Sequence, residues 1–216
     1  MEYRVNTNDE WQSYAVNTLI TLENVGDYVQ FRNNKNTLST SNSDYAQFVM
    51  TGKISGSGNI QSLLNYSSTT TAYCYRRLFQ GCSALVAPPD LLATTANYYS
   101  YASMFNSTGI KTPPKISATS VSNFCCYYMF EKCANLVAAP ELLATTLADH
   151  CYYNMFKNCS SLNYVKVHFT DWNVSYYSTT DWLNGVSASG TFTKPSALSE
   201  EYSVNKIPSG WTVVNY

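Results

Sequence analysis

The chain is poor in charge and in long apolar runs, and each shortage excludes a class of function. Charged residues make up 12% of the 216 positions and the formal net charge is −1, so the sequence offers no basic surface for nucleic acid. No apolar run approaches the roughly 18 residues that cross a bilayer, and residues 1–5 lack the apolar core of a secretion signal. We therefore expect no membrane span in this chain.

Histidine is also scarce, which argues against most catalytic and metal sites. The two histidines, His150 and His168, stand in no recognisable constellation. His150 precedes Cys151, but adjacent side chains diverge, which does not suit a nucleophile and its base. The seven cysteines form no Cys-x-x-Cys pair of the kind that zinc and redox sites use. We expect no enzyme, no cofactor and no metal.

The cysteines are better explained as small buried apolar residues. A disulfide between Cys133 and Cys159, which share a position in the repeat described below, is the alternative. Tyrosine, by contrast, is abundant at 19 residues, among many Asn and Ser. This composition is typical of recognition surfaces, because Tyr gives large contact area at low entropic cost.

An internal repeat is the strongest signal in the sequence. Phenylalanine recurs at intervals of 26, 25 and 26 residues, each time after Met or Leu: Phe79, Phe105, Phe130 and Phe156. Three residues later stand Cys82, Thr108, Cys133 and Cys159. The string Leu-Leu-Ala-Thr-Thr then occurs at 91–95 and again at 142–146. The second unit is one residue shorter than the others.

Periodicity within a unit predicts a short helix followed by a short strand. Around Phe130 the apolar residues fall at i, i+1, i+4, i+5 and i+8, which places them on one face of a helix. The segment from Leu136 to Pro140 is β-compatible and ends at a proline that cannot donate to a ladder. We therefore predict an α/β repeat solenoid in which Met, Phe, Cys and Leu form continuous internal columns.

These motifs resemble the BspA-like leucine-rich repeat family, whose units read Y-x-x-M-F-x-x-C-x-x-L-x-x-A-P-x-L-x-A-T-T. The matching residues run from Tyr152 to Leu162 and from Cys126 to Pro140, with Phe79, Cys82, Leu85 and Pro89 earlier. The resemblance implies a right-handed, leucine-rich-repeat-like stack of strand-plus-helix units. It also implies attachment to proteins or host matrix at bacterial surfaces, usually without enzymatic activity.

The flanking segments complete a three-part organisation. Residues 1–65 are predicted as a β-rich N-terminal module or cap, with strands at 20–22, 28–31 and 46–54 and a turn at 24–27. Residues 66–172 are predicted as the solenoid of about four units. Residues 173–216 are predicted as a C-terminal β cap, in which Trp182 and Trp211 join Trp172 to cover the last unit.

Two strips of each unit are expected to face solvent, and the sequence does not choose between them. The first carries Arg76, Arg77, Ala102, Ser103, Tyr127, Tyr128, Tyr153 and Asn154. Tyr and Arg dominate binding hot spots, so Arg76, Arg77, Tyr127, Tyr128, Tyr153 and Asn154 are the candidate ligand-binding residues. The second strip follows the strands through Val86-Ala87, Lys111-Thr112, Val137-Ala138 and Asn163-Tyr164.

The sequence therefore predicts a non-catalytic binding or adhesion module, extracellular or at a cell surface. Its partner would be a protein or host-matrix ligand. The alternatives are a carbohydrate-binding module, whose tyrosines would stack on sugar rings, and a receptor-binding or structural protein of a phage virion.

Overall fold

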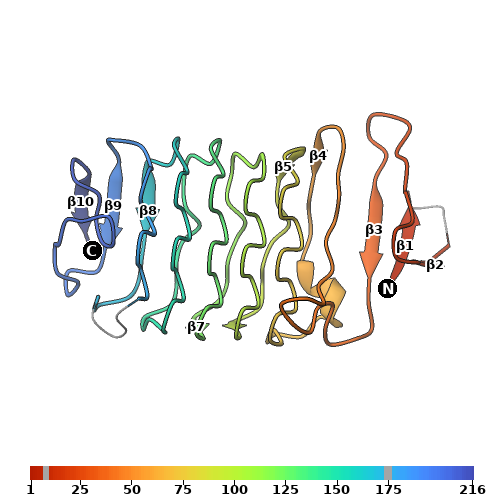
Figure 1. Cartoon of the computed structure of the whole chain (residues 1–216), viewed down its shortest axis with the longest axis horizontal. Helices are drawn as coiled ribbons and strands as arrows, with labels where there is room; N and C mark the ends of the chain where they lie inside the picture. Colours follow the sequence, from red (N-terminus) through yellow and green to blue (C-terminus); the bar gives the residue numbers. More distant parts are fainter. Residues whose placement is uncertain (7–9, 173–176) are drawn as a thin grey trace.

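The computed structural model describes residues 1–6, 10–172 and 177–216, and in it the chain winds through successive coils that lie side by side in one row (Figure 1). The two termini lie at opposite ends of the row. The regular elements are short: β1 (Glu2–Val5), β2 (Gln12–Ser13), β3 (Val29–Arg32), β4 (Ile54–Ser55), η1 (Ile60–Leu64), β5 (Leu85–Ala87), β6 (Thr95–Ala96), β7 (Ser120–Val121), β8 (Tyr164–Lys166), β9 (Thr191–Lys194) and β10 (Thr212–Asn215).

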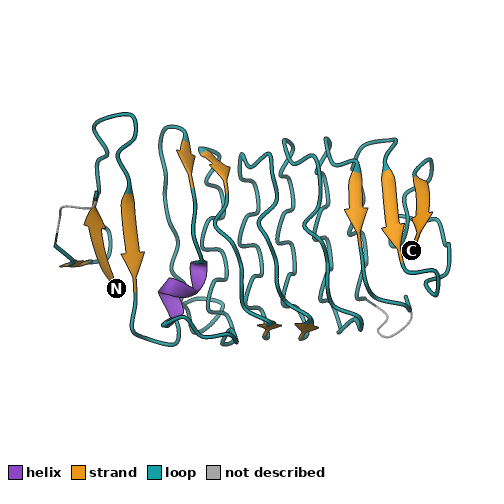
Figure 2. Cartoon of the chain, turned by 180° about the vertical axis from the view of Figure 1, so that it is seen from behind, coloured by secondary structure: helices purple, strands orange, loops and turns teal. Residues whose placement is uncertain are grey.

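The prediction of strand-plus-helix units is wrong. In the described residues the one helix is η1, a 3₁₀ turn of five residues that lies before the repeat (Figure 2). Every segment predicted as a repeat helix is instead a run of consecutive turns. These turn runs span residues 72–81, 98–107, 123–132 and 149–158, and a further turn run at 177–185 lies in the segment predicted as the C-terminal cap.

Backbone hydrogen bonds show how a turn run differs from a helix. Within a run, every second amide donates to the carbonyl three residues earlier, as Met129 N does to Cys126 O at 3.1 Å. The intervening amides donate to the next coil, as Phe130 N does to Met155 O at 2.8 Å. In an α-helix every interior amide would stay within the segment, so each of these coils depends on its neighbours for half of its hydrogen bonds.

The left-handed backbone positions follow the same rhythm. In the third run Phe124, Tyr128 and Lys132 have φ of 58°, 56° and 62°, and the spacing of four residues recurs in the other runs. Each of these residues is third in a turn closed by an i to i+3 hydrogen bond, where a positive φ is the mark of a type II turn. Turns with and without a left-handed residue therefore alternate.

This backbone repeats every four residues, which explains why the sequence pattern was misread. Apolar side chains at i, i+1, i+4, i+5 and i+8 fit one face of a turn run as well as one face of a two-turn helix. In the structure all five of these side chains around Phe130 are buried, at 3% exposure or less: Cys125, Cys126, Met129, Phe130 and Cys133.

The predicted column of phenylalanines is confirmed. The rings of Phe79, Phe105, Phe130 and Phe156 stack with centroids 5.4 or 5.5 Å apart and interplanar angles of 9° or less. Phe48 extends the column by one coil, at 5.4 Å from Phe79. Each buried Phe stabilises the fold by roughly 1.5–3 kcal/mol through burial, and each aromatic pair adds about 0.5–1.5 kcal/mol.

The cysteines link neighbouring coils of this stack by hydrogen bonds and not by disulfides. All seven cysteines are free and buried, which confirms the apolar interpretation. The thiols of Cys82, Cys133 and Cys159 each donate to the carbonyl of a Phe in the preceding coil, at 3.0 Å. Thr108, which replaces Cys in the second unit, donates instead to Phe105 O of its own coil at 2.8 Å.

Parallel pairing links the coils along most of the row. Parallel pairs join β4 to β5, β6 to β7, and β8 to β9 to β10. This pairing occurs on both sides of the predicted boundaries at residues 65 and 172. Trp172 and Trp182 are buried beside Phe192, and Trp211 is buried as well. These side chains lie inside further coils that continue the parallel pairing, and do not form the cap over the last unit that was predicted.

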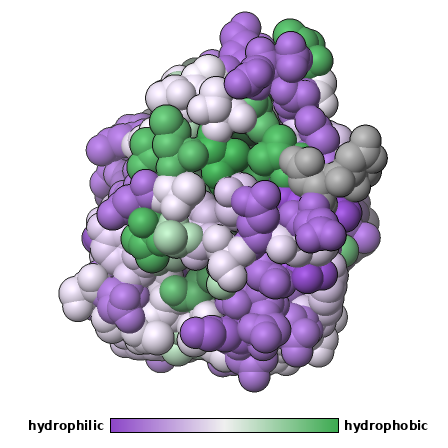
Figure 3. Space-filling model, turned by 90° about the vertical axis from the view of Figure 1, so that its right-hand side faces the viewer, coloured by the Kyte–Doolittle hydropathy of each residue, from purple (hydrophilic) through white to green (hydrophobic). Residues whose placement is uncertain are grey.

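The N-terminal segment differs, because its sheet is antiparallel in the order β2-β1-β3. The strand predicted at 28–31 is confirmed as β3, and the turn at 24–27 is closed by Asp27 N donating to Asn24 O. The strand predicted at 20–22 is absent, and of the one predicted at 46–54 only Ile54 is paired. Apolar groups show between polar ones on this end of the row (Figure 3), where Val16 and Leu19 are more than four-fifths exposed.

A glycine substitution distinguishes a turn run from a helix by the sign of its effect. Lys132 is exposed and has a φ of 62°. Relief of left-handed strain, about 1–2 kcal/mol, outweighs the entropy that glycine adds to the unfolded chain, about 0.4–1 kcal/mol. We expect Lys132→Gly to raise the free energy of unfolding in urea by about 0.5–1 kcal/mol. Exposed Ala134, outside the left-handed positions, is the control, and Ala134→Gly should lower it. A loss of about 1 kcal/mol for Lys132→Gly, as in a helix interior, would contradict the turn-run architecture.

Candidate functional site

Five aromatic rings form a second column, on the outside of the turn runs. We call the residues Tyr73, Tyr99, Phe124, His150 and Tyr177 the outer aromatic column. Successive centroids are 5.4, 4.8, 4.4 and 4.8 Å apart and the interplanar angles are 28° or less. Each residue occupies the second position of its coil's turn run or the equivalent first position of the last run, so the stacking of coils alone brings the rings into line.

More tyrosines widen this column into a surface. Tyr98 packs edge-on against Tyr73, Tyr99 and Phe124 at 4.7–5.9 Å. Tyr127 stacks on Tyr153 at 5.0 Å, and Tyr128 contacts both of them. Together with the outer aromatic column, Tyr98, Tyr127, Tyr128 and Tyr153 make up what we call the outer aromatic face.

The exposure of this face suits contact with a ligand. Tyr98 and Tyr177 are 41% and 46% exposed, and the other members are half-buried. The rings of the outer aromatic column lie nearly parallel and cover one another's faces, so their edges are turned to solvent. Tyr127 and Tyr153 cover each other in the same way. The outer aromatic column and the pair of Tyr127 and Tyr153 therefore offer mainly ring edges and phenol hydroxyls to solvent.

Partial burial raises the pKa of several tyrosine hydroxyls on this face. Burial raises the pKa of Tyr127, and the hydrogen bond with Tyr128 raises it further. Burial raises the pKa of Tyr99 and of Tyr153 as well. These phenols are therefore neutral at physiological pH and can both donate and accept hydrogen bonds.

Five of the six candidate residues named from the sequence reach the surface, and one does not. Tyr127, Tyr128 and Tyr153 belong to the outer aromatic face, and Arg76 and Arg77 lie half-buried at the same positions of the first turn run. Asn154 departs from the prediction, because it is 3% exposed. Its left-handed φ of 53° is close to those of Arg77 and Tyr128, which reach the surface, so the backbone conformation does not account for its burial.

The outer aromatic column itself was missed by the sequence reasoning. Its signal was present, since aromatic residues recur at positions 73, 99, 124, 150 and 177, at intervals of 25 to 27 residues. His150 is one of these residues, packed between Phe124 and Tyr177 with Nδ1 2.9 Å from Asp149 Oδ2. Its position is thus explained by stacking rather than by its neighbour Cys151.

The second predicted strip is less distinctive. Val137 and Tyr164 are exposed on it, at 49% and 38%, and Lys111 and Thr112 are exposed as well. Residue types alternate along this strip without forming aromatic contacts in the described part of the chain. Substitutions on this strip therefore serve as controls for binding through the outer aromatic face.

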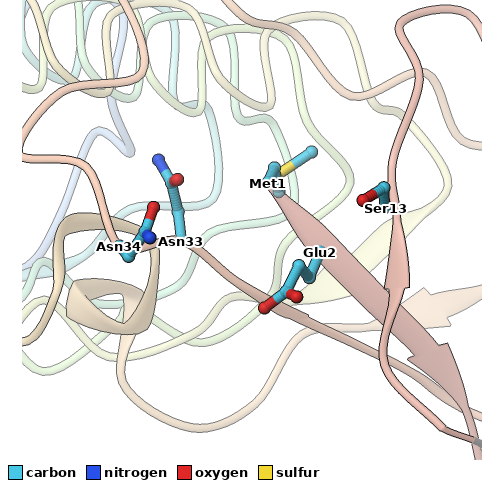
Figure 4. Close-up of a pocket in the computed structure, with 5 residues that line it drawn as sticks. All are labelled: Met1, Glu2, Ser13, Asn33 and Asn34. Atoms are coloured by element: carbon cyan, nitrogen blue, oxygen red, sulfur yellow. The ribbon is translucent and has the colours of Figure 1, made fainter.

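Two hollows lie on the surface of the described residues. One, of about 200 Å³, is lined by Met1, Glu2, Ser13, Asn33 and Asn34 (Figure 4). Its carboxylate, Glu2, is paired with Arg32 at 2.7 Å. The other, of about 360 Å³, lies near the C-terminus between residues 183–188 and 203–209 and is lined by small polar and apolar side chains such as Ser187 and Val204. Among the described residues no group of three His, Cys, Asp or Glu is arranged to hold a metal ion.

With this geometry established, the chain was compared with known proteins. No family model, curated protein or solved structure matches it. The resemblance to BspA-like repeats therefore stays a prediction based on motifs. Within the described residues, no helix has both the length and the apolar character needed to cross a bilayer.

The buried cysteines give a test of whether a nucleophilic thiol is present. Burial raises the pKa of Cys74 to about 12 and raises those of Cys82, Cys125, Cys133, Cys151 and Cys159. The thiolate is the reactive form, so we expect negligible reaction of the native protein with Ellman's reagent at neutral pH. Denaturation in guanidinium should release all seven thiols. A thiol that reacts rapidly in the native state would contradict this result.

Proposed function

We propose that this chain is a non-catalytic binding or adhesion module of a bacterial surface-type protein, and that it recognises a protein or host-matrix ligand through the outer aromatic face. The observation that carries the proposal is the alignment of partly exposed tyrosines across successive coils. The location that goes with this function is extracellular or at a cell surface.

The stack does not need these residues at the surface, which supports a role in binding. The positions of Tyr127 and Tyr128 are occupied by Ala102 and Ser103 in the preceding coil, and that coil keeps the same turns and stacking. Large aromatic side chains at such positions add contact area with few rotatable bonds, and Tyr is enriched among binding hot spots.

The orientation of the rings favours a protein over a carbohydrate ligand. Sugars bind aromatic side chains through open ring faces, whereas most faces here are covered by the neighbouring ring. Ring edges and hydroxyls suit the mixed apolar and hydrogen-bonding surface of a protein. We therefore prefer the protein ligand to the carbohydrate-binding alternative. The phage-virion alternative would use the same face.

Binding to immobilised matrix proteins tests the proposal. The wild-type chain is passed over fibronectin, fibrinogen, laminin and collagen surfaces, and over a glycan array in parallel. We expect saturable binding to a protein surface that weakens at least about tenfold in Tyr127→Ala/Tyr128→Ala, because two hot-spot residues together contribute more than about 1.4 kcal/mol. Circular dichroism and the thermal midpoint confirm that the variant is folded.

Two further tyrosines provide controls. Tyr202 is 51% exposed outside the turn runs, so Tyr202→Ala should leave binding unchanged. Tyr164 lies on the strand-side strip, and a loss confined to Tyr164→Ala would move the binding surface there and contradict the proposal. Saturable binding to sugars alone, lost in Tyr127→Ala/Tyr128→Ala, would establish the carbohydrate-binding alternative instead.

A further inference from the structure

Two arginines stand at one end of the outer aromatic face, at positions where the fold does not require charge. Arg76 and Arg77 occupy the places that Ala102 and Ser103 take in the next coil. Their backbone amides make the same bonds as their counterparts, with Arg76 N donating within the run and Arg77 N donating to Ala102 O. Small uncharged residues in the next coil therefore support the same backbone as the two arginines do, so the fold does not require charge at these positions.

The charge of this pair is not neutralised within the described chain. Neither guanidinium forms an ion pair with a described carboxylate, whereas Lys157 and Lys206 pair with Asp181 and Glu201. Arg76 Nη1 donates to the carbonyl of Asn42 at 3.0 Å, and the Arg77 guanidinium lies 5.0 Å from the Tyr45 ring centroid. Each Nε is buried without a hydrogen-bond acceptor. These contacts hold the two groups in place and leave both positive charges without a counter-charge.

Electrostatics makes a bound anion favourable at this position. Burial, and next the adjacent Arg77, lower the pKa of Arg76, which reflects the cost of two like charges in a partly desolvated place. Guanidinium nevertheless stays protonated at physiological pH. A carboxylate there would offset the repulsion and accept the strong, directional hydrogen bonds that arginine forms with planar anions.

The pair is continuous with the aromatic surface. Tyr73 and Tyr99 of the outer aromatic column, and Tyr45 beside Arg77, lie close enough to Arg76 to act on its charge. Along the row the order is Arg76-Arg77, then Ala102-Ser103, then Tyr127-Tyr128. A ligand that crosses the coils would therefore meet a cationic end, then a coil in which Ser103 is partly exposed and Ala102 is buried, and then an aromatic end.

Resting on the proposed function, we infer that Arg76 and Arg77 anchor an acidic peptide segment of the protein ligand. Asp or Glu carboxylates of the segment bind the two guanidinium groups, and its adjoining side chains lie against the tyrosines. An isolated pair in a chain of net charge −1 suits a short acidic segment rather than a polyanion such as nucleic acid.

A fluorescently labelled short peptide, hexa-L-glutamate, is the probe, and a hyaluronate oligosaccharide, which carries carboxylates on sugar rings, is the comparison. The full chain is titrated against each by fluorescence anisotropy. The test variant Arg76→Ala/Arg77→Ser installs the residues of the next coil, so folding should be retained. The control Lys111→Ala/Lys115→Ser removes the same charge from exposed residues on the strand side. We expect wild type and control to bind hexa-L-glutamate alike and the test variant to bind it at least about tenfold more weakly. The affinity should fall as the salt concentration rises.

The outcomes separate this inference from the function on which it rests. Equal losses in both variants, unchanged binding in the test variant, or no wild-type binding would overturn the anchor. Tighter binding of hyaluronate, with the same dependence on Arg76 and Arg77, would assign the anchor to a glycan and overturn the peptide assignment. If matrix proteins bind the wild type and Tyr127→Ala/Tyr128→Ala abolishes this while Arg76→Ala/Arg77→Ser does not, the proposed function stands and the anchor fails.

Discussion

The structure depends on the alternation of backbone hydrogen bonds in the turn runs. Half of the amides in each run close a turn of their own coil and the other half reach the next coil, as Met129 and Phe130 illustrate. A coil taken alone would leave those outward-pointing donors and the facing carbonyls without partners, and its Phe and Cys side chains without apolar neighbours. Stability is therefore a property of adjoining coils. The same alternation sets the distance between side chains of neighbouring coils, so it also builds both aromatic columns.

The features that depend on which residue type recurs in each unit could be predicted from the sequence. The spacing of Phe79, Phe105, Phe130 and Phe156 was enough to place them in one column, because equivalent residues of stacked units must meet. Burial of the cysteines followed from their shared position. The backbone could not be predicted in the same way. Over nine residues a period of four and one of 3.6 give the same apolar pattern, and residues such as Tyr128 and Lys132 give no sign of a left-handed conformation. Gly81, Asn154 and Asn158 were the weak signals available.

The candidate site was predicted in part for the same reason. Tyr127, Tyr128 and Tyr153 were found because they precede the Met-Phe pair, and this assignment holds for a turn run as well as for a helix. The outer aromatic column was missed although its residues lie three or four positions before those tyrosines, a spacing that shares one face in a helix as well. The residue type at this position varies among Tyr, Phe and His, so it does not repeat as the Met-Phe pair does. Asn154 was misplaced because its position in the repeat predicted exposure, as it did correctly for Tyr128, whereas the Asn154 side chain is buried. The stacking that covers the ring faces depends on the distance between neighbouring coils, and the sequence of one repeat unit does not predict this distance.

The alternation of amide donors along each turn run limits how such a chain can change in length during evolution. Adding one residue inside a run would exchange the two sets of amide donors from that point onward. Amides that close turns of their own coil would then face the next coil, and those that bind the next coil would face their own run, so the register between the coils would be lost. A residue lost outside the runs has no such effect. The second unit shows this, because its shortening falls near Gly109 and Ile110, just beyond its run, and the stacking continues. Proteins of this architecture should therefore change in length either between the runs or by whole coils, and each added coil would extend the ligand-facing surface by one further row of side chains.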